Sequence, residues 1–137
     1  MSRTCPVLIL DPDVTRNNTL SQLLVRHHVV RYAIPIYSIE AGLQFLRGAS
    51  VKLIYIHVDD IEDTLVFRFI EQAFNEIDGV SVMLMTSNPQ RTTIVRAARE
   101  GVTGFIFNDE NPFILFQSLQ QMIDFGAYIH PLIAPIF

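Results

Sequence analysis

The strongest constraint on the fold is a regular alternation between short apolar runs and longer stretches in which apolar residues recur at helical spacing. The apolar runs cover residues 6–10, 29–37, 51–58, 80–85 and 103–107, and the helical stretches cover 14–27, 38–46, 64–77, 88–101 and 111–125. The apolar runs are mostly continuous, which is typical of strands buried on both faces. A βα unit repeated five times therefore predicts a doubly wound α/β fold, with a five-stranded parallel sheet and helices on both faces.

Local signals refine this prediction. Asp13, Ser38, Asn88 and Asn111 precede helical stretches and are predicted N-caps, the last two each followed by a proline that fits the first turn of a helix. Pro35 lies inside the run 29–37 and predicts a short or edge strand there, because proline cannot donate a hydrogen bond to a neighbouring strand.

Length and composition set the class of protein. The chain has 137 residues, which suits one domain, and its 50% hydrophobic and 18% charged residues exclude a disordered polyelectrolyte. The net charge of −4, without a Lys/Arg cluster, argues against nucleic-acid binding by this segment alone. One cysteine excludes a disulfide framework, and no apolar run is long enough for a membrane span. We expect a cytoplasmic domain without membrane association.

The candidate functional residues follow the strands. In doubly wound folds, ligands bind at the carboxyl ends of the strands. Those ends carry Asp11, Pro12 and Asp13, then His57 to Asp60, then Thr86 to Asn88, and finally Asn108 and Asp109. His57 ends the most apolar strand, and we expect it at the rim of the sheet, facing a cleft.

Several segments at these positions resemble the receiver domains of two-component response regulators, in the subfamily with a LuxR/NarL-type effector. They are "VLILDPD" (7–13), "VKLIYIHVDD" (51–60), "VMLMTSN" (82–88) and "AAREGVTGFIFNDENP" (97–112), with "GAYIHPLIA" (126–134) similar to the linker that follows such a receiver. The resemblance implies a flavodoxin-like receiver domain over residues 1–126 and a linker-like tail over 127–137. The helix-turn-helix effector domain of the subfamily is absent from this chain.

The same resemblance implies an atypical receiver whose phosphorylation site is lost. His57 stands where the family has its phosphate-accepting aspartate, Pro12 stands at the second metal-binding acid beside Asp11, and Asn108 replaces the lysine. Thr86 is retained, and Phe105 occupies the position of the switch aromatic. Mg²⁺ requires oxygen ligands, which proline does not supply from its side chain and imidazole does not supply at all. We therefore predict no catalytic residue, metal or cofactor, and no enzyme activity.

His57 has three interpretations. It is a neutral histidine hydrogen-bonded to a neighbouring aspartate or carbonyl, or a proton switch whose pKa is raised by Asp11 or Asp13, or a residue phosphorylated on nitrogen. A pairing of Asp11 with His57 would explain both residues. Asp59 or Asp60 could act as a displaced phosphate acceptor, but each lies two or three residues beyond the strand end, which predicts a solvated loop several ångströms from Thr86.

The last predicted helix carries more apolar residues than one buried face needs, among them Phe113, Phe116 and Phe125. The surplus is covered by the tail or forms an interface, and we expect a homodimer or an association with another receiver-type protein. The main functional prediction is a phosphorylation-independent receiver that regulates through protein association, with DNA contacted only through an effector domain. The alternatives are a ligand- or pH-sensing receiver using the cleft around His57, and a phosphate acceptor through Asp59 or Asp60.

Overall fold

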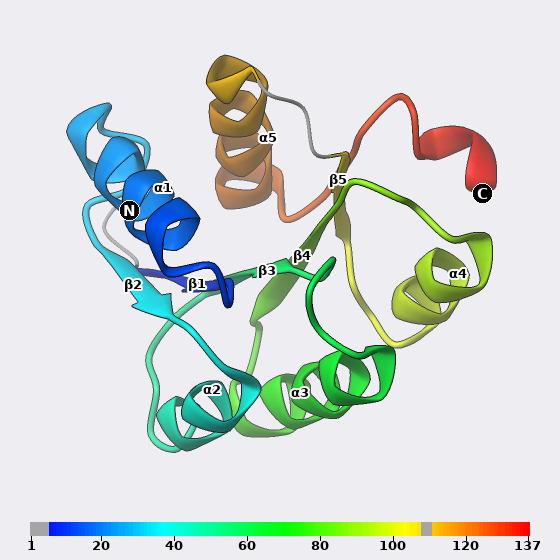
Figure 1. Cartoon of the computed structure of the whole chain (residues 1–137), viewed down its shortest axis with the longest axis horizontal. Helices are drawn as coiled ribbons and strands as arrows, with labels where there is room; N and C mark the ends of the chain where they lie inside the picture. Colours follow the sequence, from blue (N-terminus) through cyan, green and yellow to red (C-terminus); the bar gives the residue numbers. More distant parts are fainter. Residues whose placement is uncertain (1–5, 108–110) are drawn as a thin grey trace.

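The computed structural model describes residues 6–107 and 111–137. In this part of the chain, six strands form one parallel sheet in the order β2-β1-β3-β4-β5-β6 (Figure 1). The strands are β1 (Val7–Leu10), β2 (Ala33–Ile36), β3 (Leu53–His57), β4 (Ser81–Thr86), β5 (Gly104–Phe107) and β6 (Tyr128–Ile129). The helices are α1 (Val14–Arg26), α2 (Ile39–Phe45), α3 (Asp63–Glu76), α4 (Arg91–Arg99), α5 (Pro112–Phe125) and the short 3-10 helix η2 (Ala134–Ile136).

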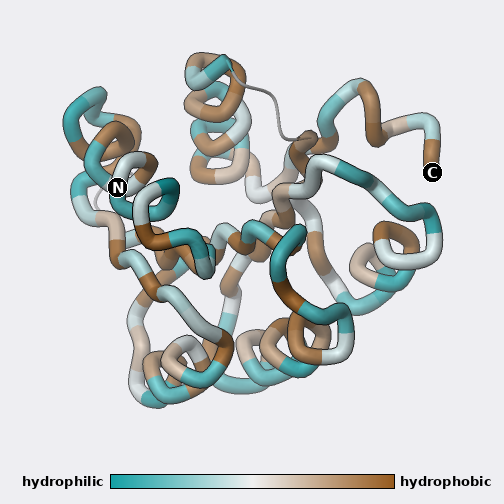
Figure 2. The backbone as a smooth tube through the Cα atoms, in the orientation of Figure 1, coloured by the Kyte–Doolittle hydropathy of each residue, from teal (hydrophilic) through white to brown (hydrophobic). Residues whose placement is uncertain are grey.

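The helices cover both faces of the sheet, as predicted. Side chains alternate along each strand, so Val7 and Ile9 of β1 join one core with α1 and α5, whereas Leu8 and Leu10 join the other core with α2, α3 and α4. Each helix shows both hydrophobic and hydrophilic residues along its turns (Figure 2), as expected for helices with one face on the sheet. The predicted doubly wound α/β architecture is therefore confirmed, although the prediction of five strands is wrong by one.

The sixth strand comes from the tail. β6 pairs in parallel with β5, and the His130 N–H donates a hydrogen bond of 2.8 Å to the Phe105 carbonyl. The chain then buries Ile133 and ends beside α4, where the Arg91 guanidinium donates to the Ile136 carbonyl at 2.9 Å (Figure 1). The tail thus covers the edge of β5, but Phe125 of α5 stays 75% exposed.

Three of the four predicted helix caps are confirmed. The side chains of Asp13, Ser38 and Asn111 accept hydrogen bonds from the first turns of α1, α2 and α5. The prediction for Asn88 is wrong, because α4 begins at Arg91 after an N-cap at Gln90 that makes no side-chain capping bond. Pro35 lies in the edge strand β2, as its missing N–H predicts.

None of the helices in the described residues is long and apolar enough to cross a membrane.

Candidate functional site

The predicted site residues meet at the carboxyl ends of β1, β3 and β4. Asp11 is 1% exposed, His57 is 2% exposed and Thr86 is 5% exposed. The expectation that His57 faces an open cleft is therefore wrong, because it is the last residue of β3 and its side chain is enclosed. Because a buried polar atom without a hydrogen bond costs free energy, the partners of these three side chains determine the stability and the charge state of the site.

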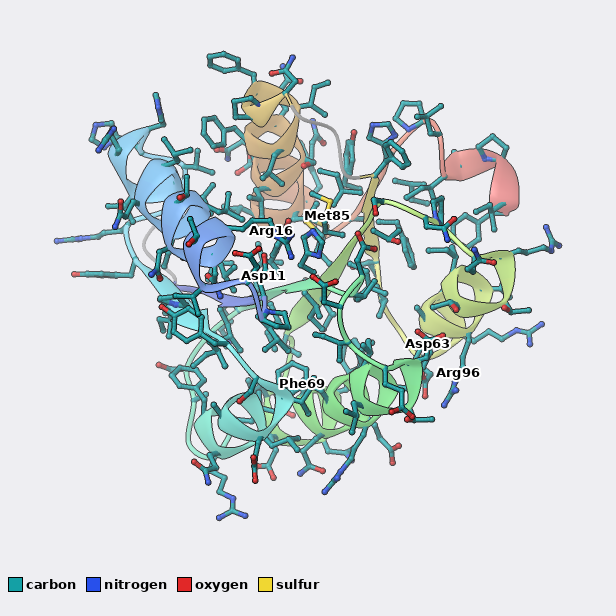
Figure 3. All side chains as sticks on the ribbon, viewed as in Figure 1. Asp11, Arg16, Asp63, Phe69, Met85 and Arg96 are labelled. Carbon is teal, nitrogen blue, oxygen red and sulfur yellow. The ribbon has the colours of Figure 1, made fainter. Side chains whose placement is uncertain are left out.

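The main partner of Asp11 is Arg16, a residue for which the sequence analysis had no role. The Arg16 guanidinium binds both carboxylate oxygens of Asp11, with Nε at 2.7 Å from Oδ2 and Nη2 at 2.8 Å from Oδ1 (Figure 3). It also lies 3.3 Å from Asp60 Oδ2 and 3.8 Å from Asp13 Oδ2. Bidentate pairing of this kind is among the strongest protein hydrogen-bonding arrangements, and it raises the pKa of Arg16 above its usual value.

The first turn of α1 positions Arg16. The Asp13 carboxylate caps the helix by accepting a hydrogen bond of 2.9 Å from the Arg16 N–H. The Asp11 carboxylate in turn accepts a bond of 2.9 Å from the Asp13 N–H, which fixes the turn between β1 and α1. Side chains in a helix point toward its N-terminus, so Arg16 is directed back over the end of β1.

His57 contacts Arg16 instead of an aspartate. Its Nδ1 lies 3.4 Å from Arg16 Nη2, and no hydrogen bond to Asp11 accompanies this contact in the described part of the chain. A hydrogen bond across this contact requires Nδ1 to accept, because a guanidinium can only donate, and it would place the ring proton on Nε2. Nε2 is buried without a hydrogen-bond partner among the described residues. The predicted pairing with Asp11 is therefore wrong.

The pKa of His57 is lowered, so the predicted upward shift is also wrong. Burial is the main cause and the positive charge of Arg16 adds to it, which together outweigh the opposing carboxylates of Asp11, Asp59 and Asp60. The neutral state, the first of the three interpretations, is the state that this environment favours.

Asp59 lies on an exposed turn after β3, as the prediction of a solvated loop requires, but the predicted separation from Thr86 is wrong, because its carboxylate reaches the end of β4. Its Oδ1 accepts a hydrogen bond of 3.0 Å from the Thr86 hydroxyl, and both carboxylate oxygens lie 3.1 Å from the Ser87 N–H. The Ser87 hydroxyl donates to Oδ2 as well. Burial raises the pKa of Asp59, but the bonds from Ser87 and Thr86 outweigh this effect and leave it below the usual range.

The remaining predicted residues are less central. Pro12 contributes no side-chain ligand, and Phe105 is a core residue, 1% exposed, whose ring packs 5.5 Å from that of Phe137. Asn108 lies outside the described residues.

The donor set does not fit a magnesium ion. The Arg16 guanidinium already occupies both oxygens of Asp11 and lies 3.8 Å from Asp13 and 3.3 Å from Asp60, so a metal ion would have to displace it from these carboxylates. No cluster of three or more His, Cys, Asp and Glu side chains suited to a metal occurs in residues 6–107 and 111–137. Groups of the chain itself therefore occupy the site: Arg16 is the cation beside Asp11, and Asp59 is the anion bound by Thr86 and Ser87.

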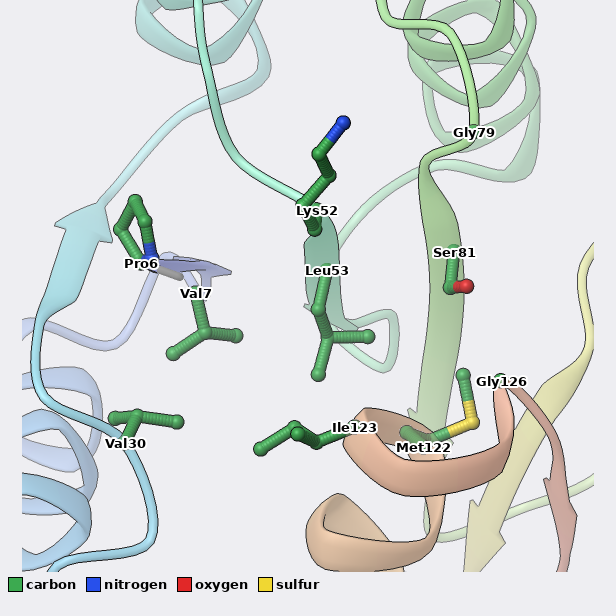
Figure 4. A pocket seen from close by; sticks show the side chains of 10 residues that line it. All are labelled: Pro6, Val7, Val30, Lys52, Leu53, Gly79, Ser81, Met122, Ile123 and Gly126. Carbon is green, nitrogen blue, oxygen red and sulfur yellow. The ribbon is translucent and has the colours of Figure 1, made fainter. Parts of the chain in front are cut away.

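A cavity of about 260 Å³ lies at the opposite, amino-terminal end of the strands. Its wall is mainly apolar, with Val7, Val30, Leu53 and Ile123 facing one another, while the Lys52 side chain extends away from them (Figure 4). This wall offers no pair of acid and base groups, so we place no chemistry there.

Comparison with known proteins identifies the fold. No protein-family model matches the chain. A response regulator receiver domain (CheY-like) from Methanospirillum hungatei matches with a TM-score of 0.76 and 19% identity, over 88% of this chain and 94% of that one. A putative pilus assembly-related protein from Burkholderia pseudomallei matches with a TM-score of 0.74 and 17% identity, over 94% and 96% of the two chains. A LuxR family DNA-binding response regulator from Silicibacter pomeroyi matches with a TM-score of 0.71 and 19% identity, over 90% and 92%.

Among curated proteins, the alanine–tRNA ligase of Rickettsia akari is 26% identical over 88 residues, which are 64% of this chain and 10% of the ligase. The chain thus matches about a tenth of that enzyme, and the comparison does not assign it an activity. The structural matches show that the chain has the receiver fold.

The environment of His57 predicts an acid-sensitive stability. Because the pKa of His57 in the folded chain lies below its ordinary value of 6.5, the unfolded chain binds a proton more readily, and the free energy of unfolding should fall as the pH drops below about 6.5. The fall should end once the pH is below the folded pKa. Urea unfolding at closely spaced pH values between about 5 and 8 measures this slope.

The His57→Asn variant should lose that part of the slope, since asparagine does not titrate. The control is His28→Asn at an exposed position with a positive φ of 57°, a conformation that asparagine tolerates. Equal pH slopes in the wild type and in His57→Asn would contradict the assignment.

Proposed function

We propose that this chain is a receiver-fold signalling module that works without phosphorylation and regulates by associating with another protein. The observation that carries the proposal is the bidentate contact between Arg16 and the buried carboxylate of Asp11. A receiver that forms an acyl phosphate needs a carboxylate acceptor with a divalent cation beside it. Here the acceptor position holds His57, and the cation position holds a tethered guanidinium.

Asp59 supports the same proposal, because its carboxylate occupies the groups that would bind a phosphoryl anion. The Thr86 hydroxyl and the Ser87 N–H are the groups that could bind phosphoryl oxygens, and both already donate to the Asp59 carboxylate. A phosphoryl group would have to displace a carboxylate that is part of the chain. The intramolecular carboxylate pays no entropy of association, so it competes effectively.

The experiment is incubation of the full chain with acetyl phosphate and MgCl₂, followed by intact mass spectrometry. We expect no added phosphate, because neither the acceptor nor the cation site is available. A stable phosphate adduct on any residue would contradict the proposal.

A second candidate, a displaced phosphate acceptor at Asp59, is favoured by its 3.0 Å contact with Thr86. In that case the adduct would form, and it would disappear in Asp59→Asn but persist in Asp60→Asn. The reverse pattern would identify Asp60. An adduct retained by both variants and stable to alkali, which hydrolyses acyl phosphates, would instead point to nitrogen chemistry at His57.

Association of two copies is the form of regulation that the exposed apolar surface supports best. Phe113 and Phe125 on α5 are 64% and 75% exposed, and Leu132 of the tail is 64% exposed. Phe113 and Phe125 lie at the two ends of α5, and large exposed apolar side chains are candidate contacts with a partner surface. Sedimentation over a wide concentration range should show a monomer–dimer equilibrium, and a strict monomer throughout would count against it. On this proposal, any DNA contact belongs to an effector domain of a LuxR-type regulator and not to this chain.

A further inference from the structure

A groove of about 530 Å³ lies beside the candidate site, between α2 and the start of α3. Its floor is apolar: Ile39 and Leu43 lie one turn apart on α2, Ile61 lies in the turn before α3, and Leu65 lies in the first turn of α3. Leu65 is 39% exposed, so a large aliphatic side chain on this floor is open to solvent. The side chains of α2 and of the start of α3 thus form a groove into which a third helix can pack.

The packing of α2 against α3 holds the groove in shape. Gly42 of α2 faces the ring of Phe69, and a Cβ at this position would lie 2.7 Å from a ring carbon. Phe69 is fully buried between the two helices (Figure 3). The close approach at Gly42 means that the groove is a preformed surface, which lowers the conformational cost of binding.

The rim of the groove is acidic. Glu40, Asp60 and Glu62 carry three carboxylates on exposed residues, against the single guanidinium that Arg68 contributes to the described rim. An apolar floor with an excess of negative charge at its edge is complementary to a helix that has leucine-like residues on one face and Lys or Arg beside them. The same rim repels phosphates, so it disfavours nucleic acids and anionic lipid surfaces.

A second copy of this chain is a poor source of such a helix, because two of the three arginines of its α4 are already engaged. Arg91 there donates to the Ile136 carbonyl, and Arg96 lies 3.9 Å over the ring of Phe67. Both guanidinium groups are engaged within their own chain.

We propose that the groove between α2 and α3 binds a basic amphipathic helix of a different protein. This inference names the partner chemistry for the proposed regulation by association with another protein and rests on that proposal, whereas the self-association through α5 concerns a different surface. Asp60 belongs both to the groove rim and to the Arg16 cluster, at 3.3 Å from Nη2, so a bound Lys or Arg would compete with Arg16 for the same carboxylate. Binding of the partner helix would thus weaken the contact between Arg16 and Asp60 in the candidate site.

The test uses a synthetic peptide of Leu and Lys arranged with all leucines on one helical face, titrated into the ¹⁵N-labelled full chain. Two further peptides serve as controls: one with the same composition in scrambled order, and one with Glu in place of Lys. We expect saturable amide shifts at residues around Ile39, Leu43 and Leu65 with the amphipathic Leu/Lys peptide alone. Shifts centred on α5 or the tail, no saturable binding at millimolar peptide, or equal binding of the Leu/Glu peptide would each overturn the inference.

Matched variants distinguish peptide binding in the groove from a general attraction to the negative charge of the chain. The double variant Glu40→Gln/Glu62→Gln should weaken binding roughly fivefold to tenfold, since two rim charges are lost. The control Glu71→Gln/Asp124→Asn changes two exposed carboxylates elsewhere by the same net charge and should change the affinity less than about twofold. Equal losses in both double variants would overturn the inference. If the peptide does not bind and the acetyl phosphate experiment gives no adduct, the proposed peptide groove is refuted, but the proposed phosphorylation-independent function is not.

Discussion

Replacing Arg16 with alanine should destabilise the chain by about 2–3 kcal/mol, because it leaves the buried carboxylate of Asp11 without its counter-ion. Removing one partner of a fully buried ion pair costs about 3–5 kcal/mol. Asp11 is 1% exposed but the Arg16 side chain is 38% exposed, so solvent screening lowers the expected loss below that range. Urea unfolding at constant pH measures the difference, with the exposed Arg99→Ala as the control expected to change stability by less than about 0.5 kcal/mol.

A double variant tests whether the loss comes from the orphaned charge. Asp11→Asn in the Arg16→Ala background removes the buried negative charge and should restore part of the stability. If the double variant is less stable than Arg16→Ala alone by the full amount that Asp11→Asn costs in the wild type, the two residues do not interact.

Arg16→Ala should also make stability depend on divalent cations. With the guanidinium gone, the carboxylate of Asp11 is free to bind a largely hydrated Mg²⁺, which needs only one or two protein carboxylates, and binding to the folded state raises the melting temperature by mass action. The wild type should show no rise beyond that in NaCl of equal ionic strength. A comparable rise in both proteins would mean that Arg16 does not substitute for a cation.

The sequence predicted the elements that depend on local pattern and missed contacts that depend on tertiary context. The five βα units were readable because each has its own periodicity and most have their own cap. The two residues of β6 carry no such signal, since Tyr128 and Ile129 become a strand only because β5 offers an open edge.

Arg16 was missed because a charged residue in the first turn of a helix is usually solvated. The available signal was the cap at Asp13, which places Arg16 three residues into the helix and directs its side chain back toward Asp11.

Asp59 was misplaced for a different reason. The estimate assumed that the chain continues as an extended strand beyond β3, with about 3.3 Å per residue. Instead the chain turns at once, with the Ile61 N–H donating to the Val58 carbonyl at 3.1 Å, and this turn brings Asp59 to Thr86 and Ser87. The sequence pattern pointed to Thr86 at the end of β4, but not to Asp59 as the carboxylate that it binds.

Replacing Ile133 with alanine should cost about 2–5 kcal/mol, although the residue lies in a tail that resembles a linker in sequence. Ile133 is 0% exposed and belongs to the core cluster that contains Phe105 and Val102. Truncation there leaves a cavity and weakens the attachment of β6 to β5, so the loss should appear as a lower urea midpoint with little change in slope.

The neighbouring Leu132 is the matched control, since it is 64% exposed and its replacement by alanine should cost less than about 0.5 kcal/mol. Amide exchange of His130, whose N–H donates to the Phe105 carbonyl, should accelerate in Ile133→Ala and remain slow in Leu132→Ala. If the two variants were equally stable, the tail would be a dispensable extension and the edge of β5 would be open to partners. A large loss confined to Ile133→Ala would instead mean that this edge is closed by the chain itself, so that a partner must bind elsewhere, either on α5 or in the groove between α2 and α3.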